Sequence, residues 1–217
     1  MTRLAVFDCD GTLVDGQAAI CAAMEAGFAA AGLAPPARHA IRRIVGLSLP
    51  QAVRLLAPDA GEERRGVVVA AYKATFRTTR EAGALEEPLF PGITGLLNTL
   101  AANGWALAVA TGKSDRGLAH CLAAHGIAGL FVSLQTADRH PSKPHPAMLE
   151  AAMTEAGATP ETTVMIGDTG FDMAMARAAG VRALGVDWGY HSVAELLADG
   201  AEAVAATPAE LAELLER

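Results

Sequence analysis

Short runs of apolar residues recur along this chain, and segments with helical spacing separate them. The runs lack the alternation of polar and apolar residues that a strand with one solvated face shows, so they predict strands buried on both faces. Strands that alternate with helices predict an α/β fold with a doubly wound parallel sheet. The predicted strands are Arg3–Phe7, Trp105–Ala110, Leu130–Leu134, Thr162–Ile166 and Val181–Val186, with a weaker one at Ala201–Ala205. The predicted helices among them are Ile93–Ala102, Ser114–His125, Pro146–Ala156, Phe171–Ala179, Ser192–Ala198 and Pro208–Glu216.

One connection breaks this alternation. From Asp15 to Leu85 the chain runs for about seventy residues without a convincing strand, whereas a βα connection takes roughly 2–6 residues. The segment is therefore predicted to be an inserted helical domain of residues 15–85, and residues 1–14 and 86–217 to form the core domain. Its predicted helices are Gln17–Ala31, Arg38–Val45, Leu49–Leu56 and Glu62–Glu81.

The composition limits the partners of the protein. The 217 residues are 52% hydrophobic and 19% charged, which indicates a folded chain. The net charge of −7 argues against nucleic acid or an anionic membrane surface as a partner. The three cysteines form no metal-ligand pattern and indicate reduced thiols in the cytoplasm. The uncharged stretch 88–112 is interrupted by proline, glycine and asparagine, so we expect no membrane-spanning helix.

Polar residues follow four of the predicted strands. In doubly wound sheets ligands bind at the carboxyl ends of the strands, so these residues are expected to meet at one edge. Carboxylates crowded there repel one another, and a hard cation such as Mg²⁺, with a phosphate oxygen of the substrate, relieves the repulsion. The pattern therefore predicts a Mg²⁺–phosphate pocket. Its residues, in chain order, are Asp8, Asp10, Thr111, Gly112, Lys113, Lys143, Asp168 and Asp172.

Several members of this set also have simpler explanations. Asp8 alone could be a helix N-cap, and Asp172 could be an acid favoured by the dipole of a first helical turn. Lys143 and Lys113 could be solvated lysines. Asp8 and Asp10, two residues apart between an apolar run and Gly-Thr, are harder to explain by capping.

Together the strand-end motifs resemble those of the haloacid dehalogenase superfamily of phosphohydrolases. The DxDGT motif corresponds to residues 8–12, the second-motif threonine to Thr111, the third-motif lysine to Lys143, which precedes a proline, and the GDxxxD motif to residues 167–172. The resemblance covers essentially the whole chain. The inserted helices resemble the small α-helical cap of the branch that contains phosphoglycolate phosphatases and β-phosphoglucomutases, and residues 104–113 look most like the phosphoglycolate phosphatases.

This resemblance implies a reaction and a role for each acidic residue. Asp8 attacks phosphorus and forms an aspartyl phosphate, and Asp10 protonates the leaving alkoxide before it activates water. The dehalogenases of the superfamily lack an acid at the second position because halide leaves without a proton, so Asp10 favours a phosphatase. Mg²⁺ is expected to be held by Asp8, the main-chain carbonyl of Asp10 and Asp168, with Asp172 supporting these ligands.

The resemblance also implies which residues bind the substrate. Thr111, Gly112 and Lys143 are expected to bind the oxygens of the transferred phosphoryl group. A cap that closes over the core excludes water and contacts the leaving group. Within the cap we expect Asp15, Gly46 and Leu47 to line the substrate, with Arg42 or Arg43 nearby.

The expected function is Mg²⁺-dependent hydrolysis of a small-metabolite phosphomonoester similar to phosphoglycolate. A β-phosphoglucomutase-like phosphosugar mutase, an inorganic pyrophosphatase and a nucleotide phosphatase remain alternatives. A non-catalytic phosphoaspartate signalling module is an alternative from another class. The expected partner is a small phosphorylated metabolite, and the expected state is a monomer or homodimer.

Overall fold

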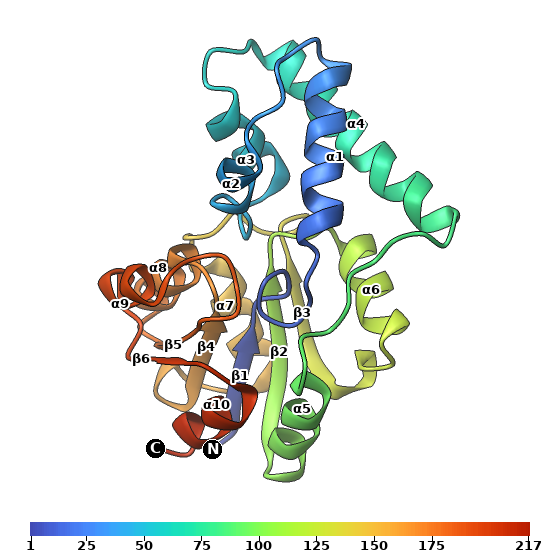
Figure 1. Cartoon of the computed structure of the whole chain (residues 1–217). Helices are drawn as coiled ribbons and strands as arrows, with labels where there is room; N and C mark the ends of the chain where they lie inside the picture. The colour runs from blue at the N-terminus through green and yellow to red at the C-terminus, as the bar shows by residue number, and fades with distance from the viewer.

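The computed structural model describes residues 1–217 and contains a six-stranded sheet with four further helices beyond its carboxyl edge (Figure 1). The strand order is β3-β2-β1-β4-β5-β6, and all neighbouring strands are parallel. This topology confirms the predicted α/β fold with a doubly wound parallel sheet. The strands are β1 (Arg3–Phe7), β2 (Trp105–Thr111), β3 (Phe131–Thr136), β4 (Thr163–Gly167), β5 (Arg182–Val186) and β6 (Ala203–Ala205).

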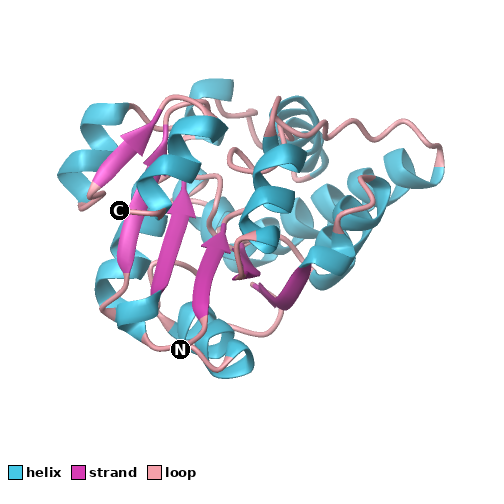
Figure 2. Ribbon diagram, turned by 90° about the horizontal axis from the view of Figure 1, so that it is seen from below, coloured by secondary structure: helices cyan, strands magenta, loops and turns pink.

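Helices cover both faces of the sheet (Figure 2). Side chains of β1 alternate between the two faces: Ala5 and Phe7 pack with one set of helices, and Leu4 and Val6 pack with the other. The first set is α5 (Ile93–Ala102), α6 (Asp115–Ala124) and α10 (Pro208–Leu215). The second set is α7 (Ala147–Ala156), α8 (Gly170–Ala179) and α9 (Val193–Asp199). Burial on both faces explains why the strand segments carry no polar alternation.

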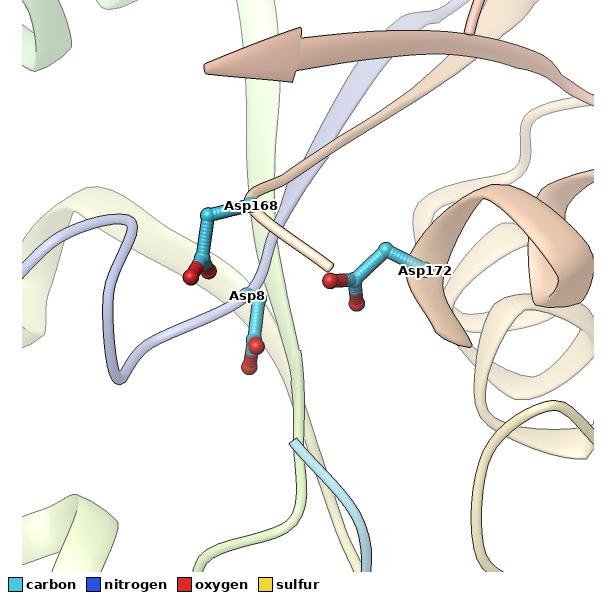
Figure 3. A group of neighbouring side chains, drawn as sticks. All are labelled: Asp8, Asp168 and Asp172. Carbon is cyan, nitrogen blue, oxygen red and sulfur yellow. The ribbon is translucent and has the colours of Figure 1, made fainter. Parts of the chain in front are cut away.

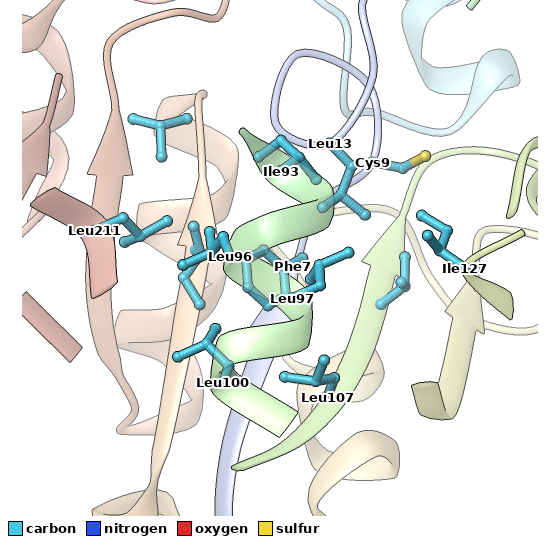
Figure 4. Packing of buried hydrophobic residues seen from close by; sticks show 14 of the residues in the cluster. Phe7, Cys9, Leu13, Ile93, Leu96, Leu97, Leu100, Leu107, Ile127 and Leu211 are labelled. Carbon is cyan, nitrogen blue, oxygen red and sulfur yellow. The ribbon is translucent and has the colours of Figure 1, made fainter. Parts of the chain in front are cut away.

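The larger apolar cluster lies between the sheet and α5. Leu96, Leu97 and Leu100 of α5 lie over Phe7 of β1 and Leu107 of β2 (Figure 4). These side chains are nearly inaccessible to solvent, and each such burial contributes roughly 1.5–3 kcal/mol to folding. The strands that lead to the carboxyl edge are therefore firmly anchored.

Several predicted strand boundaries differ from the structure by one or two residues. β2 and β4 each extend one residue further, to Thr111 and Gly167, because their last residues still pair with neighbouring strands. β3 begins at Phe131 rather than Leu130, because residues 128–130 form the 3₁₀ turn η1 (Ala128–Leu130). A second such turn, η2 (Pro160–Thr162), precedes β4.

The inserted helices pack on one another around an apolar cluster of their own. They are α1 (Gln17–Ala30), α2 (Arg38–Arg42), α3 (Leu49–Leu56) and α4 (Glu62–Glu81). α1 and α4 approach closely at Gly27, where a Cβ would lie 2.9 Å from the carbonyl oxygen of Val68. No helix of the protein combines the length and the apolarity needed to cross a membrane.

α2 ends at Arg42, whereas the sequence predicts a helix as far as Val45. Residues 43–46 form turns, and Gly46 has a φ of +97°, a value that is strained for any residue with a Cβ. The chain therefore leaves the helix early and turns towards the carboxyl edge of the sheet.

Candidate active site

The chain order reverses between β1 and β4, which are neighbours in the sheet. Asp8 directly follows β1 and Asp168 directly follows β4, and the main-chain N–H of Asp8 donates a hydrogen bond of 2.9 Å to the carbonyl oxygen of Ile166. Connections leave such a switch point towards opposite faces of the sheet and open a crevice between them. The sequence-predicted carboxylates therefore lie where this fold binds its ligands.

Three carboxylates gather at this point (Figure 3). Asp8, Asp168 and Asp172 can each offer an oxygen so that the three oxygens lie within 4.8 Å of one another, and all three side chains are fully buried. Asp168 accepts hydrogen bonds from Thr12 Oγ1 at 2.8 Å and from the main-chain N–H of Tyr190 at 2.9 Å. These donors fix the orientation of the Asp168 carboxylate.

Asp172 lies in the first turn of α8 and is held in two ways. Its Oδ2 accepts hydrogen bonds from the N–H and the hydroxyl of Thr169, which together form a capping box at the start of the helix. Its Oδ1 lies 2.7 Å from Lys143 Nζ. Asp172 is therefore the helix-start acid that one explanation from the sequence describes, and its role as a site residue stays a prediction.

Lys143 is fully buried between two of the carboxylates. Its Nζ lies 2.9 Å from Asp8 Oδ1 and 2.7 Å from Asp172 Oδ1. Burial by itself lowers the pKa of Lys143, but Asp172 and Asp8 outweigh that effect and hold the pKa above its ordinary value. Lys143 is therefore a permanent cation beside Asp8.

One lysine does not neutralise this cluster. The pKa of Asp8 is raised to about 7, because burial disfavours the carboxylate and Asp172 lies close, while Lys143 acts in the opposite direction. The pKa of Asp168 lies well above its ordinary value because of burial and the charges of Asp8 and Asp172. Oδ2 of Asp8 is buried without a hydrogen-bond partner. A buried set of carboxylate oxygens with one orphaned member fits a hard divalent cation such as Mg²⁺.

Asp10 belongs to a second charged group. Lys113 Nζ lies 3.0 Å from Asp10 Oδ1 and 2.5 Å from Glu87 Oε1, so one lysine bridges two carboxylates. The pKa of Asp10 is raised by burial and by Glu87, while Lys113 lowers it. Glu87 lies in the segment that returns from α4 to the core, so this group connects the active site with the root of the inserted helices.

Gly112 lets the inserted domain approach the core. A Cβ at this position would lie 2.7 Å from the carbonyl oxygen of Gly46 and closer still to that of Leu47. A Cβ at Gly46 would in turn lie 3.7 Å from Asp8 Oδ2. Ser48 then donates its main-chain N–H to Ser142 Oγ at 2.8 Å. The loop of residues 46–48 therefore covers the carboxylate of Asp8.

The expected substrate contact of Arg43 stays a prediction, and the structure places this side chain in an ion pair. Its guanidinium lies 2.5 Å from Glu195 Oε1, and its carbonyl oxygen lies 3.2 Å from His191 Nε2. Arg43 thus joins the inserted domain to the core outside the cavity that reaches Asp10.

Thr111 is buried at the end of β2, beside Gly112.

Sequence reasoning missed several residues that shape this site. The pattern of a threonine three residues before Asp172 is a capping-box signature and could have identified Thr169. Tyr190 contributes only its main-chain N–H, which every residue except proline has, so its residue type does not predict this contact. Glu87 lies 26 residues from Lys113 in the sequence, and no local pattern joins the two.

Comparison with known proteins agrees with this geometry. The family model described as haloacid dehalogenase-like hydrolase matches residues 5–186. The probable phosphatase IndB of Dickeya dadantii is 38% identical over 216 residues, which are 97% of this chain and 92% of that protein. Phosphoglycolate phosphatase 1 of Pseudomonas aeruginosa is 31% identical over 198 residues, 88% of this chain and 71% of that protein.

The fold also matches solved structures. A predicted phosphatase from Clostridium acetobutylicum superposes with a TM-score of 0.89 at 24% sequence identity, and the match covers 100% of both chains. The likeness includes the inserted helices as well as the sheet, because the whole chain is covered.

Proposed function

The chain belongs to the haloacid dehalogenase-like hydrolase family and is a phosphatase of that family. On this premise we propose that it hydrolyses the phosphomonoester of a small metabolite. The proposed reaction needs Mg²⁺ and passes through a phosphorylated Asp8. The observation that carries the proposal is the unpartnered Oδ2 of Asp8, buried at the switch point of the sheet beside Lys143. A nucleophilic carboxylate needs such a free oxygen, a fixed orientation and a neighbouring cation.

The charge distribution supports the metal. A bound Mg²⁺ would be held by Asp8, Asp168 and the main-chain carbonyl of Asp10, with Asp172 in support, and would neutralise charge on the phosphoryl oxygens. Lys143 and Thr111 would bind the remaining phosphoryl oxygens, and Gly112 leaves room beside them. The raised pKa values of Asp8 and Asp168 indicate that Lys143 alone does not neutralise these buried carboxylates.

In the proposed first step an oxygen of Asp8 forms a bond to phosphorus and the ester P–O bond breaks. The leaving oxygen takes the proton of the Asp10 carboxyl group. In the second step Asp10 takes a proton from water while the water oxygen attacks phosphorus, and the bond between Asp8 and phosphorus breaks to release phosphate. The raised pKa of Asp10 favours the protonated form that the first step needs.

The test is steady-state hydrolysis of 4-nitrophenyl phosphate with Mg²⁺. Asp8→Asn is expected to lose at least about a thousandfold in kcat, because the nucleophile is removed. The matched control is Asp187→Asn, an exposed residue after β5, which keeps wild-type activity. Thermal unfolding of both variants checks the fold. Wild-type turnover by Asp8→Asn, or full activity of metal-stripped enzyme, would contradict the proposal.

The same assay separates the alternative reactions. Phosphate release from phosphoglycolate, phosphosugars, pyrophosphate or nucleoside monophosphates identifies the hydrolase and its substrate group. Isomerisation of a phosphosugar without free phosphate identifies a mutase. A long-lived phosphorylated Asp8 without steady-state release identifies a signalling module.

We also propose that residues 15–85 act as a cap over a core of residues 1–14 and 86–217. The separate apolar cluster of α1 to α4 supports this division. The contacts across the division include polar ones, such as the ion pair of Arg43 with Glu195, and these can break and reform as the cap opens.

A further inference from the structure

A cavity of about 470 Å³ extends from Asp10 and Lys113 into the space between α1, α4, the loop after α2 and the start of α6. In Figure 1 α4 descends towards the side of the molecule that carries α6, and residues of both helices line the cavity. The two-carbon organic part of phosphoglycolate would fill a small fraction of it. The cavity has the size of sites that take considerably larger ligands.

The part of the cavity nearest the core is apolar and aromatic. Ile20 and Met24 of α1 face Tyr72 and Phe76 of α4, and Leu47 of the covering loop closes one side. The rings of Tyr72 and Phe76 lie 5.0 Å apart with an interplanar angle of 36°. Burial and the charge of Asp10 raise the pKa of the Tyr72 hydroxyl above its ordinary value, while Lys113 lowers it, so this ring lies near Asp10. Such walls suit a flat apolar group, because aromatic rings pack best against other rings.

Another part of the cavity wall is cationic. Lys73, Arg77 and Arg80 of α4 and Arg116 of α6 line it, and none of the four forms an ion pair with a carboxylate. Nε of Arg80 is buried without a hydrogen-bond partner. One carboxylate, Asp138, also lines this part, and it accepts a hydrogen bond from the main-chain N–H of Asp115.

Lys73, Arg77 and Arg116 are exposed at the cavity wall, and Arg80 is half-buried there. Clustered positive charge at the wall of a cavity attracts an anionic group of a ligand. Tyr72 and Arg80 lie eight residues apart on α4, which corresponds to about 12 Å along the helix axis. The transferred phosphoryl group belongs at Asp8, so these cations would meet a different anionic group.

We propose that the leaving group of the substrate carries a planar, ring-containing section and, beyond it, a second anionic group. The ring section lies against Tyr72 and Phe76, and the second anionic group is bound by Arg80 with Arg77 and Arg116 near it. This inference rests on the proposed phosphatase function, since it assumes that the phosphoryl group lies at Asp8. Tyr72, Phe76 and Arg80 are therefore specificity-determining residues.

The test compares substrates that differ only in one charge. We expect the wild-type enzyme to hydrolyse 3- or 4-carboxyphenyl phosphate with a kcat/KM at least about tenfold above that of the matching neutral carbamoylphenyl phosphate, because a charge-assisted hydrogen bond has about that effect. The kcat/KM for the better of the two carboxyphenyl phosphates is also expected to exceed that for phosphoglycolate. Arg80→Met should reduce the ratio of the charged to the neutral substrate to about two. Arg64→Met, an exposed arginine of the same helix outside the cavity, is the matched control and leaves the ratio unchanged.

A second measurement tests the ring section. Phe76→Leu removes a ring and keeps an apolar side chain, so the KM for carboxyphenyl phosphate should rise while that for phosphoglycolate changes little. The inference is overturned if phosphoglycolate is hydrolysed as efficiently as the best aryl substrate. It is also overturned if the wild-type enzyme hydrolyses the charged and the neutral aryl phosphate with the same kcat/KM. The same holds if Arg77→Met, Arg80→Met and Arg116→Met all keep the wild-type ratio of these two kcat/KM values. In those outcomes the phosphatase proposal stands, whereas failure to hydrolyse every monoester would remove both.

Discussion

The carboxyl edge of the sheet and the cavity beneath the helical insertion use positive charge in opposite ways. At the edge, Lys143 is fully buried and lies within 2.9 Å of two carboxylates. In the cavity, Arg77 and Arg80 have no carboxylate partner. Charges that are paired inside the protein hold reacting groups in place, and unpaired ones remain available to a ligand. The comparison indicates that the edge determines the reaction and the cavity determines the substrate.

The two regions also differ in how they are anchored. Asp8 and Asp168 follow strands that are buried on both faces and hydrogen-bonded to each other. The helices α1 to α4 have a smaller apolar cluster and join the core through only two chain segments. The edge is therefore expected to stay rigid while the insertion moves.

Removing the cation at the edge should have the largest effect. Lys143→Met leaves Asp8 and Asp172 as unpaired buried acids, so we expect a loss of about 3–5 kcal/mol in the free energy of unfolding at neutral pH. Activity should fall by about a thousandfold or more, because the phosphoryl group loses its cation. Urea unfolding and hydrolysis of 4-nitrophenyl phosphate measure both.

The matched variant is Lys73→Met, at an exposed lysine of the cavity wall. It should leave the free energy of unfolding unchanged within about 0.5 kcal/mol. If both lysine variants are equally stable, the contrast between paired and unpaired cations is wrong.

The contact between the two regions can be disturbed at Gly112. In Gly112→Ala the new Cβ meets the carbonyl oxygens of Gly46 and Leu47, so the covering loop must move away from Asp8. We expect kcat/KM to fall by about 10–100-fold, since small displacements of positioning groups have effects of that size. Gly95→Ala is the control, because a Cβ in that part of α5 meets open space. Similar kinetics for both alanine variants would show that the close approach is unimportant.

The strain among the edge carboxylates should appear as a pH dependence of stability, the smallest of these effects. The pKa of Asp8 is about 7 in the folded protein and 3.8 ordinarily, so the folded state retains a proton that the unfolded state releases between these values. The resulting stabilisation is complete below pH 3.8 and is lost as the pH rises through about 7. Without Mg²⁺, Asp8→Asn should therefore gain stability relative to the wild type on the order of 1 kcal/mol between pH 5 and 8.

Mg²⁺ should reverse that gain, because the cation binds the ionised carboxylate and stabilises the wild type. Thermal unfolding of both proteins at each pH, with and without Mg²⁺, measures the difference. A difference that does not change with pH would show that Asp8 is not under electrostatic strain.

Much of the edge could be predicted because it depends on local patterns. Apolar runs without alternation locate strands, and the residue after each strand of a parallel sheet lies at the same edge. Asp8 and Asp168 follow from that rule together with their residue types, and Lys143 comes after β3 and a short loop. The helix boundaries were predicted less well where tertiary contacts intervene, as at Gly46, whose positive φ ends the turn after α2.

The contacts of the insertion could not be predicted in the same way. Arg43 was expected at the substrate, yet it pairs with Glu195, which lies 152 residues later in the chain. The spacing of Tyr72, Phe76 and Arg80 places them on one face of a helix, but it does not state what that face meets. The sequence did not indicate a role for Lys113, because its ion pairs with Glu87 and Asp10 join residues that are far apart in the chain.

The amino-acid sequence alone determined the α/β fold, the position of the insertion and the set of acidic residues at the strand ends, because each depends on spacing within one segment. Only the tertiary structure decided which cations are neutralised and which remain free, because the field at a side chain depends on the neighbours that folding places within a few ångströms of it. For this protein that distinction separates Lys143, bound by two carboxylates, from Arg80, which pairs with no carboxylate of the chain.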